Sequence, residues 1–216
     1  GNVVKGLSTK GFLAVGVPGT VAGLDYALAK YGTLPRATVM APSVALAEEG
    51  FTLDQGDVDM LSLAAEDFGR DPASARIFLD QGRPYAVGER LVQKDLAGTL
   101  RAISARGRDG FYKGAVGDAL TAASRAQGGL IVQADLDRYT TRELPPIECD
   151  YRGYRVISAP PPSSGGVVIC EMLNILEGYD LAGLGWGSAQ AIHYEIEAMR
   201  HAYIDRNSYQ IGRAHV

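Results

Sequence analysis

The stretch Pro160-Pro161-Pro162-Ser163-Ser164-Gly165-Gly166 is the most unusual in this 216-residue chain, and it decides how the region around it folds. Three consecutive prolines fix φ and hold the backbone in an extended, polyproline-like form, which forbids regular structure there. The two serines can cap a following helix, and the two glycines let another backbone or a ligand approach closely. The stretch therefore predicts a sharp corner that leads into a helix.

The residues on both sides of this corner support that prediction. Before it, residues 147–150 and 154–158 are extended runs joined through Tyr151-Arg152-Gly153, which indicates a strand pair or a strand and a turn. After it, residues 167–176 are apolar nearly all round, as in a buried helix, and Gly178 supplies a stop. The corner is thus expected to connect a short strand region, near 145–159, to a buried helix.

The rest of the chain is predicted to be mostly helical. A last helix is expected from Ser188, with Ile192, Ile196, Met199 and Tyr203 on one face. Upstream, helical spacing with start and stop signals covers 20–30, 35–50, 54–68, 93–105 and 110–127, with a brief helix and loop over 71–88 and a short helix around Asp135, Asp137 and Arg138. We therefore predict a predominantly helical α+β fold, without a linker, as a single domain over 1–210.

Composition excludes several classes of function. The chain has 21 basic and 25 acidic residues, a net charge of -4, and no run of like charge, so nucleic acid is not an expected partner. No apolar stretch approaches the ~18 residues of a membrane span. Cys149 and Cys170 are too few for a disulfide framework and form no C-x-x-C pair, so we expect free, partly buried thiols.

Ser163, Ser164, Gly165 and Gly166 are the candidate site residues, and three interpretations of them stay open. They can form a rigid strand-to-helix corner, or a ligand-facing loop whose helix N-terminus suits a carboxylate or phosphate. A serine nucleophile is the third interpretation. It is disfavoured because the segment is not a G-x-S-x-G elbow and no base is adjacent.

Two other patterns carry weaker signals for metal or cofactor binding. His193, Glu197 and His201 share one stripe of the last expected helix, but their spacing is not H-E-x-x-H. We therefore expect a solvated face with internal His–Glu–His and Glu–Arg contacts and no metal. The glycine-rich run over 11–23 lacks the features of a P-loop or a dinucleotide-binding motif. We interpret it as a strand end, a Pro-Gly turn and a tightly packed helix start, and we expect no cofactor.

Over residues 10–209 the chain resembles the large subunit of gamma-glutamyltransferases. The corner followed by Asn174-Ile175-Leu176-Glu177 is a highly specific part of that resemblance, and Tyr203, Asp205 and Arg206 are similar to the family. The other matching segments, in order, are Gly16-Val17-Pro18-Gly19-Thr20-Val21-Ala22-Gly23, Tyr31-Gly32-Thr33-Leu34-Pro35, Gly110-Phe111-Tyr112-Lys113-Gly114, Gly128-Gly129-Leu130-Ile131, Asp135-Leu136 and Tyr151-Arg152-Gly153-Tyr154.

The resemblance implies an N-terminal-nucleophile hydrolase with an αββα architecture. Such an enzyme is made as one precursor that cuts itself, so that a small subunit begins with a threonine whose own amine acts as base. It transfers the gamma-glutamyl group of glutathione and related amides to water or to an amino acid. Location in the periplasm or outside the cell follows from the resemblance alone.

The residues that perform this chemistry are expected outside this chain. The family's glutamate-binding arginine precedes residue 1, and its threonine follows residue 216, so we expect an interior, catalytically incomplete piece of the large subunit. The pair Thr140-Thr141 is followed by Arg142-Glu143 rather than by histidine, and it is not assigned the catalytic role. No residue of this chain is therefore expected to be catalytic.

The last residues depart from the family pattern. Residues 211–216, Ile-Gly-Arg-Ala-His-Val, are what ATCGGAAGAGCACACGTC encodes, which looks like a DNA sequencing adaptor. We expect 211–216 to be a non-native tail from read-through, and different codons in the gene would contradict this. Two alternatives to a glutathione hydrolase are a related self-processing acylase of the cephalosporin type and a non-catalytic helical scaffold.

Overall fold

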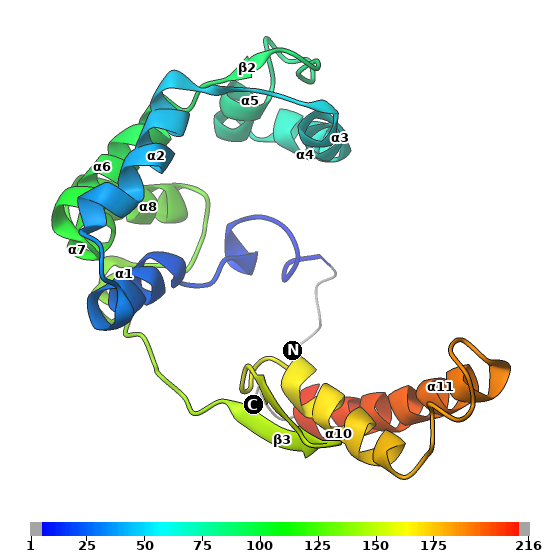
Figure 1. Ribbon diagram of the computed structural model, residues 1–216. Helices are drawn as coiled ribbons and strands as arrows, with labels where there is room; N and C mark the ends of the chain where they lie inside the picture. Colours follow the sequence, from blue (N-terminus) through cyan, green and yellow to red (C-terminus); the bar gives the residue numbers. More distant parts are fainter. Residues whose placement is uncertain (1–5, 212–216) are drawn as a thin grey trace. The chain divides into compact units, whose positions relative to one another are not determined.

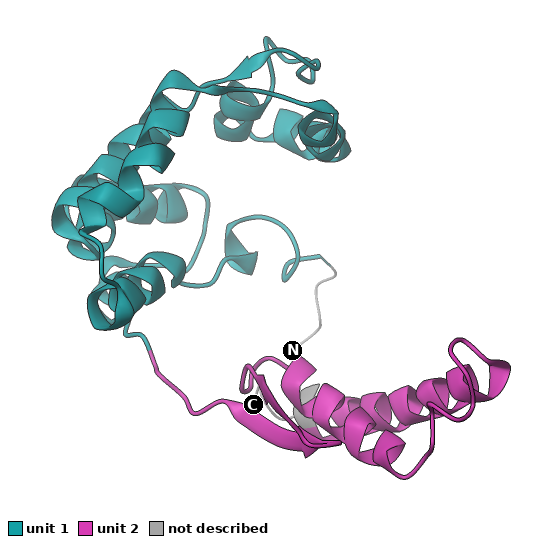
Figure 2. Ribbon diagram, in the orientation of Figure 1, with its two compact units in different colours: residues 1–141 teal, residues 142–216 magenta. Residues whose placement is uncertain are grey.

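The computed structural model describes residues 6–211, which fall into two compact units, residues 1–141 and 142–216 (Figure 1, Figure 2). No helix among the described residues is long and apolar enough to cross a membrane. The expectation of a single domain over 1–210 stays a prediction, because two compact units can belong to one domain of a longer protein. Residues 212–216 of the expected tail lie outside the described residues.

Unit 1 is mostly helical (Figure 1). Its helices are α1 (Thr20–Tyr31), α2 (Arg36–Glu49), α3 (Gln55–Leu63), α4 (Ala65–Arg70), α5 (Pro72–Phe78), α6 (Lys94–Arg106), α7 (Asp109–Tyr112), α8 (Ala115–Ala126) and α9 (Gln133–Arg138), after a 3-10 turn, η1 (Phe12–Ala14). Short strands β1 (Phe51–Thr52) and β2 (Arg90–Leu91) pair antiparallel. Helix α2 packs against α6, which places the longest helices of this unit side by side.

Three expectations for unit 1 are corrected. The helix expected over 54–68 is broken at Ala64, and the helix expected over 110–127 is broken at Gly114, whose φ of 65° suits glycine. Residues 15–19 have no regular secondary structure, so the expected strand end is wrong. The tight helix start is confirmed, because a Cβ on Gly19 would lie 2.0 Å from the hydroxyl oxygen of Tyr139.

The core of unit 1 is built around Tyr112, which is fully buried. Ala22, Ile131 and Leu136 are buried with it, and the Tyr139 ring stacks on the Tyr112 ring at 5.8 Å. These residues come from α1, α7, α9 and the segment before α9. The core therefore joins the first and last helices of the unit.

Unit 2 contains a β-hairpin and a helix pair (Figure 1). Its elements are β3 (Ile147–Tyr151), β4 (Tyr154–Ser158), α10 (Gly165–Glu177), α11 (Ala189–Asp205) and a π-helical segment, η2 (Arg206–Ile211). The strands are antiparallel, with Ile147 opposite Ser158 and Tyr151 opposite Tyr154. Helix α10 packs against both β3 and α11. The predicted strand region, the sharp corner and the helix after it are confirmed. The extended, polyproline-like form expected for the prolines is wrong, because residues 161–162 form a turn that the Ser163 amide and the Pro160 carbonyl close.

Cys149 and Cys170 form a disulfide bond, so the expectation of free thiols is wrong. Cys149 lies at a half-buried position of β3, in alternation with exposed neighbours, and Cys170 lies on the buried side of α10. Because α10 packs against β3, the two Cα atoms come within 5.9 Å, a normal separation for a disulfide. The pairing depends on this contact between a strand and a helix.

The side chains on the two sides of α11 differ in size and in burial. Ala191, Ala198 and Ala202 are buried, and they let α10 approach closely. The apolar residues expected on one face, Ile192, Ile196, Met199 and Tyr203, are between 44% and 49% exposed. The small side of the helix, rather than its large apolar side, therefore makes the contact within unit 2.

Candidate functional site

The corner at 160–166 turns the chain from β4 into α10. The amide of Ser163 donates to the carbonyl of Pro160 at 3.2 Å, which closes a turn, and the carbonyl of Ser164 accepts the amide of Val168 at 3.1 Å. Ser163 is exposed and Ser164 is half-buried. The structure therefore brings the four predicted residues together at the start of one helix, as expected for a strand-to-helix corner.

Ser164 does not cap α10 with its side chain, which corrects one expectation. Its backbone has φ -85° and ψ -15°, rather than the extended geometry that lets a hydroxyl reach back to the first turn. Its hydroxyl instead accepts a hydrogen bond from Nε of Arg206 at 2.8 Å. Arg206 also lies over the ring of Tyr203, 5.5 Å from its centroid. Because a guanidinium is a donor that keeps its protons, Arg206 cannot act as a base toward Ser164.

The two glycines of the corner have different surroundings. A Cβ on Gly166 would lie 2.8 Å from the carbonyl oxygen of Ala159 and 3.0 Å from Cβ of Ser158. A Cβ on Gly165 would have only the hydroxyl of Ser163 nearby, at 3.8 Å. The close backbone approach predicted for the glycines is therefore confirmed at Gly166, where the end of β4 meets α10. The functional role of the corner stays a prediction.

A hollow of about 370 Å³ lies between α10 and α11 and holds several titratable groups. Burial, together with a hydrogen bond to Asp205 and its charge, raises the pKa of Glu171, and the charge of His201 opposes this rise. On the same side of α11, the hydrogen bond from Arg200 lowers the pKa of Glu197, helped by the charges of Arg200 and of the flanking histidines.

The histidine stripe of α11 borders this hollow, which Glu197 and His201 line. Nη1 of Arg200 donates to both carboxylate oxygens of Glu197, at 2.6 and 2.8 Å, so the expected Glu–Arg contact is confirmed. His193 and His201 are exposed. Among the residues that the structure describes, no cluster of three or more His, Cys, Asp or Glu side chains is arranged to hold a metal ion.

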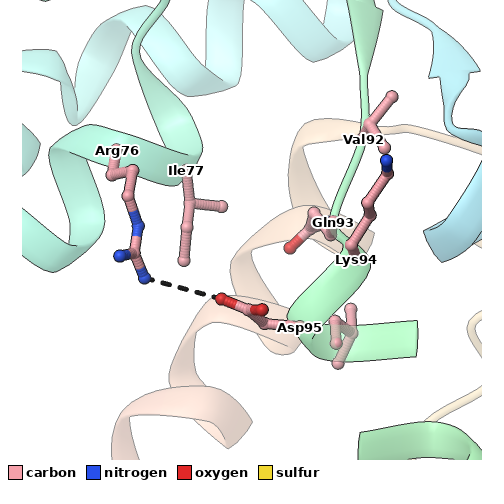
Figure 3. A pocket seen from close by; sticks show the side chains of 7 residues that line it. Arg76, Ile77, Val92, Gln93, Lys94 and Asp95 are labelled. Atoms are coloured by element: carbon pink, nitrogen blue, oxygen red, sulfur yellow. Dashed lines mark hydrogen bonds and ion pairs between the residues drawn. The ribbon is translucent and has the colours of Figure 1, made fainter. Parts of the chain in front are cut away.

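A second hollow, of about 280 Å³, lies in unit 1 between α5 and the start of α6 (Figure 3). Arg76 reaches across it to Asp95, with 3.5 Å between nitrogen and oxygen, and Ile77 and Val92 form apolar parts of its wall. The side chains of Arg76 and Asp95 are 73% and 90% exposed, so this ion pair is weak. The hollow is therefore typical of a solvated surface between two helices.

Two features of unit 2 were missed by sequence reasoning. The Cys149–Cys170 bond could have been suspected from the sequence pattern. Cys149 lies at an inward position of a strand, Cys170 lies at a buried position of the next helix, and one corner joins the two elements. The contact of Arg206 with Ser164 spans 42 residues, and no local pattern indicates it.

Comparison with known proteins identifies the family. A sequence model of gamma-glutamyltranspeptidase matches residues 2–213. The chain is 65% identical to the glutathione hydrolase proenzyme of Pseudomonas sp. (strain A14), over 97% of this chain and 36% of that protein. It is 48% identical to the acylase ACY 1 proenzyme of Pseudomonas sp. (strain SE83), over 91% of this chain and 35% of that protein.

A solved structure agrees with these relatives. The Helicobacter pylori gamma-glutamyltranspeptidase matches with a TM-score of 0.95 and 41% identity, over 100% of this chain and 62% of that chain. The chain spans about a third of the length of the curated relatives described above. Ordered sequence motifs, the helical α+β fold and these matches agree, and the chain belongs to the gamma-glutamyltranspeptidase family.

Proposed function

We propose that the complete protein removes the gamma-glutamyl group from glutathione and related gamma-glutamyl amides, and that this chain is part of its large subunit. The observation that carries the proposal is the difference between two relatives. The chain is 65% identical to a glutathione hydrolase proenzyme and 48% identical to an acylase proenzyme. The higher identity extends over nearly the whole chain, so it favours the glutathione hydrolase.

In this proposal the nucleophile is an N-terminal threonine outside the chain. Its α-amine, with an ordinary pKa of about 7.7–8.0, takes the proton of its own hydroxyl near neutral pH. The hydroxyl oxygen attacks the gamma-glutamyl carbonyl, the amine of the substrate leaves, and an acyl-enzyme forms. Water or an amino acid then accepts the acyl group. The residues described here contribute a scaffold rather than reacting atoms.

The proposed partner of this chain is the small subunit cut from the same precursor. In support, unit 1 has an apolar groove of about 560 Å³ between α1, α2 and α6. Leu24 is 67% exposed and Val39 is 46% exposed along it, while the Asp25–Arg36 ion pair, at 2.7 Å, is already satisfied. A groove of this kind suits an apolar segment of the precursor.

We further propose that the protein works in the periplasm or outside the cell. The Cys149–Cys170 disulfide supports this location, because structural disulfides persist mainly in oxidising compartments. Fractionation of a cell that expresses the complete gene tests it. Enzyme recovered with the cytoplasm, with both cysteines reduced, would contradict the proposal.

The function is tested with the complete gene. The purified, processed enzyme is expected to release p-nitroaniline from gamma-glutamyl-p-nitroanilide, and alanine in place of its N-terminal threonine is expected to abolish this release. A cephalosporin amide tests the acylase alternative in parallel. Hydrolysis of that amide without gamma-glutamyl release would favour an acylase. A complete gene without a nucleophilic threonine downstream of this chain would favour a non-catalytic scaffold.

A further inference from the structure

The groove between α1, α2 and α6 is lined by apolar side chains at helical spacing. These side chains are Val21, Leu24 and Leu28 on α1, Val39 and Met40 on α2, and Leu100 and Ile103 on α6. Ile103 is buried, whereas Leu24 and Val39 are exposed. Spacings of three and four residues on neighbouring helices are the pattern by which helices pack against further helices. The lining of α1 extends from Thr20 to Leu28, about 12 Å at ~1.5 Å per residue, which is about two helical turns.

The charged residues that line the groove, Asp25 and Arg36, are already paired with each other. Oδ1 of Asp25 accepts hydrogen bonds from Nε and Nη2 of Arg36, both at 2.7 Å, and Oδ2 accepts the amide of Arg108 at 3.0 Å. A charged side chain that entered the groove would therefore lose water and find both lining charges satisfied. Because desolvation of an uncompensated charge costs several kcal/mol, the surface that fits this groove is uncharged.

The groove also offers few hydrogen-bonding groups to a chain that enters it. Besides the paired Asp25 and Arg36, its polar lining residues are Thr20 and Ser43, with one hydroxyl each. An extended segment has an amide and a carbonyl at nearly every residue, and each one left unsatisfied in the groove would cost about 1–3 kcal/mol. A helix pairs these groups internally and presents only side chains. The groove therefore favours a helix over an extended segment.

The rest of the precursor is long enough to supply this helix. The chain spans about a third of the length of its curated relatives, so about two thirds of such a precursor lies outside the matched region. The solved Helicobacter pylori chain also extends beyond the match, since this chain covers 62% of it. A covalently encoded partner is present at a fixed ratio to this chain, which suits a surface that is apolar and uncharged.

We propose that the groove between α1, α2 and α6 is the docking site of a helix from the same precursor, outside residues 1–216. This helix inserts an uncharged apolar stripe at positions i, i+3 or i+4, and i+7. The proposal rests on the proposed function in one respect, namely that this chain works together with the rest of a self-processed precursor. Docking buries Leu24 and Val39 and covers the Asp25–Arg36 pair.

Photocrosslinking of the complete, processed enzyme tests the proposal. In two variants p-benzoylphenylalanine replaces Val39 or Ser43, which are exposed, line the groove and lie one helical turn apart on α2. Both probes are expected to attach to one segment outside residues 1–216, at points three or four residues apart. Points two residues apart would overturn the proposal, because ~6 Å along α2 corresponds to about two residues of an extended chain. Attachment within this chain, attachment to a second copy, or no attachment would also overturn it.

A probe at Leu63 is the matched control for the crosslinking. Leu63 ends α3, is 83% exposed and does not line the groove, so its probe should not attach to the same segment. Attachment of the Leu63 probe to that segment would contradict docking in the groove. Release of p-nitroaniline from gamma-glutamyl-p-nitroanilide is measured on the same samples. Activity without the crosslink refutes the docking alone, whereas the crosslink without activity refutes the proposed function alone.

A charge placed in the groove gives a second measurement. Leu24→Asp should shift the Tm of the 216-residue chain by less than about 1 °C, because Leu24 is mostly exposed there. In the complete enzyme the same carboxylate would be desolvated by the docked helix, so the Tm should fall by at least about 3 °C. Leu24→Met keeps an apolar side chain and should leave both Tm values nearly unchanged. Equal shifts for Leu24→Asp in the chain and in the complete enzyme would show that the groove stays open.

Discussion

Replacing Tyr112 by phenylalanine removes one oxygen atom from the core of unit 1. That hydroxyl donates to the carbonyl of Pro18 at 2.5 Å and accepts the amide of Ala22 at 3.4 Å. Ala22 lies in the first turn of α1, where amides have no partner within the helix, and Gly19 at the N-cap has no side chain to supply one. The hydroxyl of Tyr112 therefore performs the task of a capping side chain from 90 residues away.

The magnitude follows from the two contacts. Loss of a helix N-cap costs about 1 kcal/mol, and loss of a hydrogen bond to a carbonyl in a dry environment costs about 1 kcal/mol more. Tyr112→Phe should thus lower the free energy of unfolding by about 2 kcal/mol. For a chain of this size that corresponds to a decrease in Tm of roughly 4–8 °C.

Differential scanning calorimetry measures this decrease, with Tyr154→Phe as the matched control. Tyr154 is 74% exposed, so its replacement should leave Tm nearly unchanged. Alkaline pH provides a second signature. Burial raises the pKa of Tyr112 above its ordinary value of 10.0, so this group contributes stability that is present below pH 10 and lost as the pH rises through the raised pKa. Tyr112→Phe should therefore lose less stability than the original chain as the pH rises through that pKa.

Two results would refute this reasoning about Tyr112. One is a change below about 0.5 kcal/mol, the range of ordinary surface substitutions. The other is an alkaline loss of stability as steep in the variant as in the original chain. Either result would show that the hydroxyl contributes no cap.

Three further predictions concern the corner, an acid-sensitive loop and activity. Gly166→Ala should lower the free energy of unfolding in urea by about 1–3 kcal/mol, because the new Cβ would meet the Ala159 carbonyl. Gly165→Ala, the control, should be nearly neutral, and equal effects of the two substitutions would contradict the packing described. The hydrogen bond from Arg83 lowers the pKa of Glu89 to about 2, so its stabilising contribution is present above pH 4.5 and lost as the pH falls toward 2. Thermal melts of Glu89→Gln should accordingly depend less on pH across that window, and an unchanged dependence would speak against the contact. Finally, the 216-residue chain alone should release no p-nitroaniline from gamma-glutamyl-p-nitroanilide, and release that survives repurification would show that it contains a nucleophile.

Sequence reasoning succeeded where the signal was local. The last helix begins after Ser188, as predicted, and the Ser188 hydroxyl caps it by accepting the amide of Ala191 at 3.2 Å. Gly50 and Gly107 end α2 and α6 with positive φ, and the corner ends the hairpin as its prolines require. Each of these features depends on residues that are only a few positions apart. The element types and the family resemblance follow from such short segments.

The missed features depend on contacts between distant residues. No glycine or proline marks the break at Ala64, and the β1–β2 pairing joins segments about forty residues apart. The disulfide requires the packing of α10 on β3, and the Ser164 hydroxyl turns to Arg206 rather than to its own helix. The position of the candidate site was predictable from the sequence, whereas the partners of its side chains were not.

The contact between Arg206 and Ser164 also has a consequence for the order of assembly during synthesis. Because Arg206 follows Ser164 by 42 residues, the ribosome completes the corner and α10 well before it adds the guanidinium. A nascent chain that stops within α11 therefore has a Ser164 hydroxyl that only water can satisfy. Arg206, the first residue of η2, thus completes a bend that was made much earlier in synthesis.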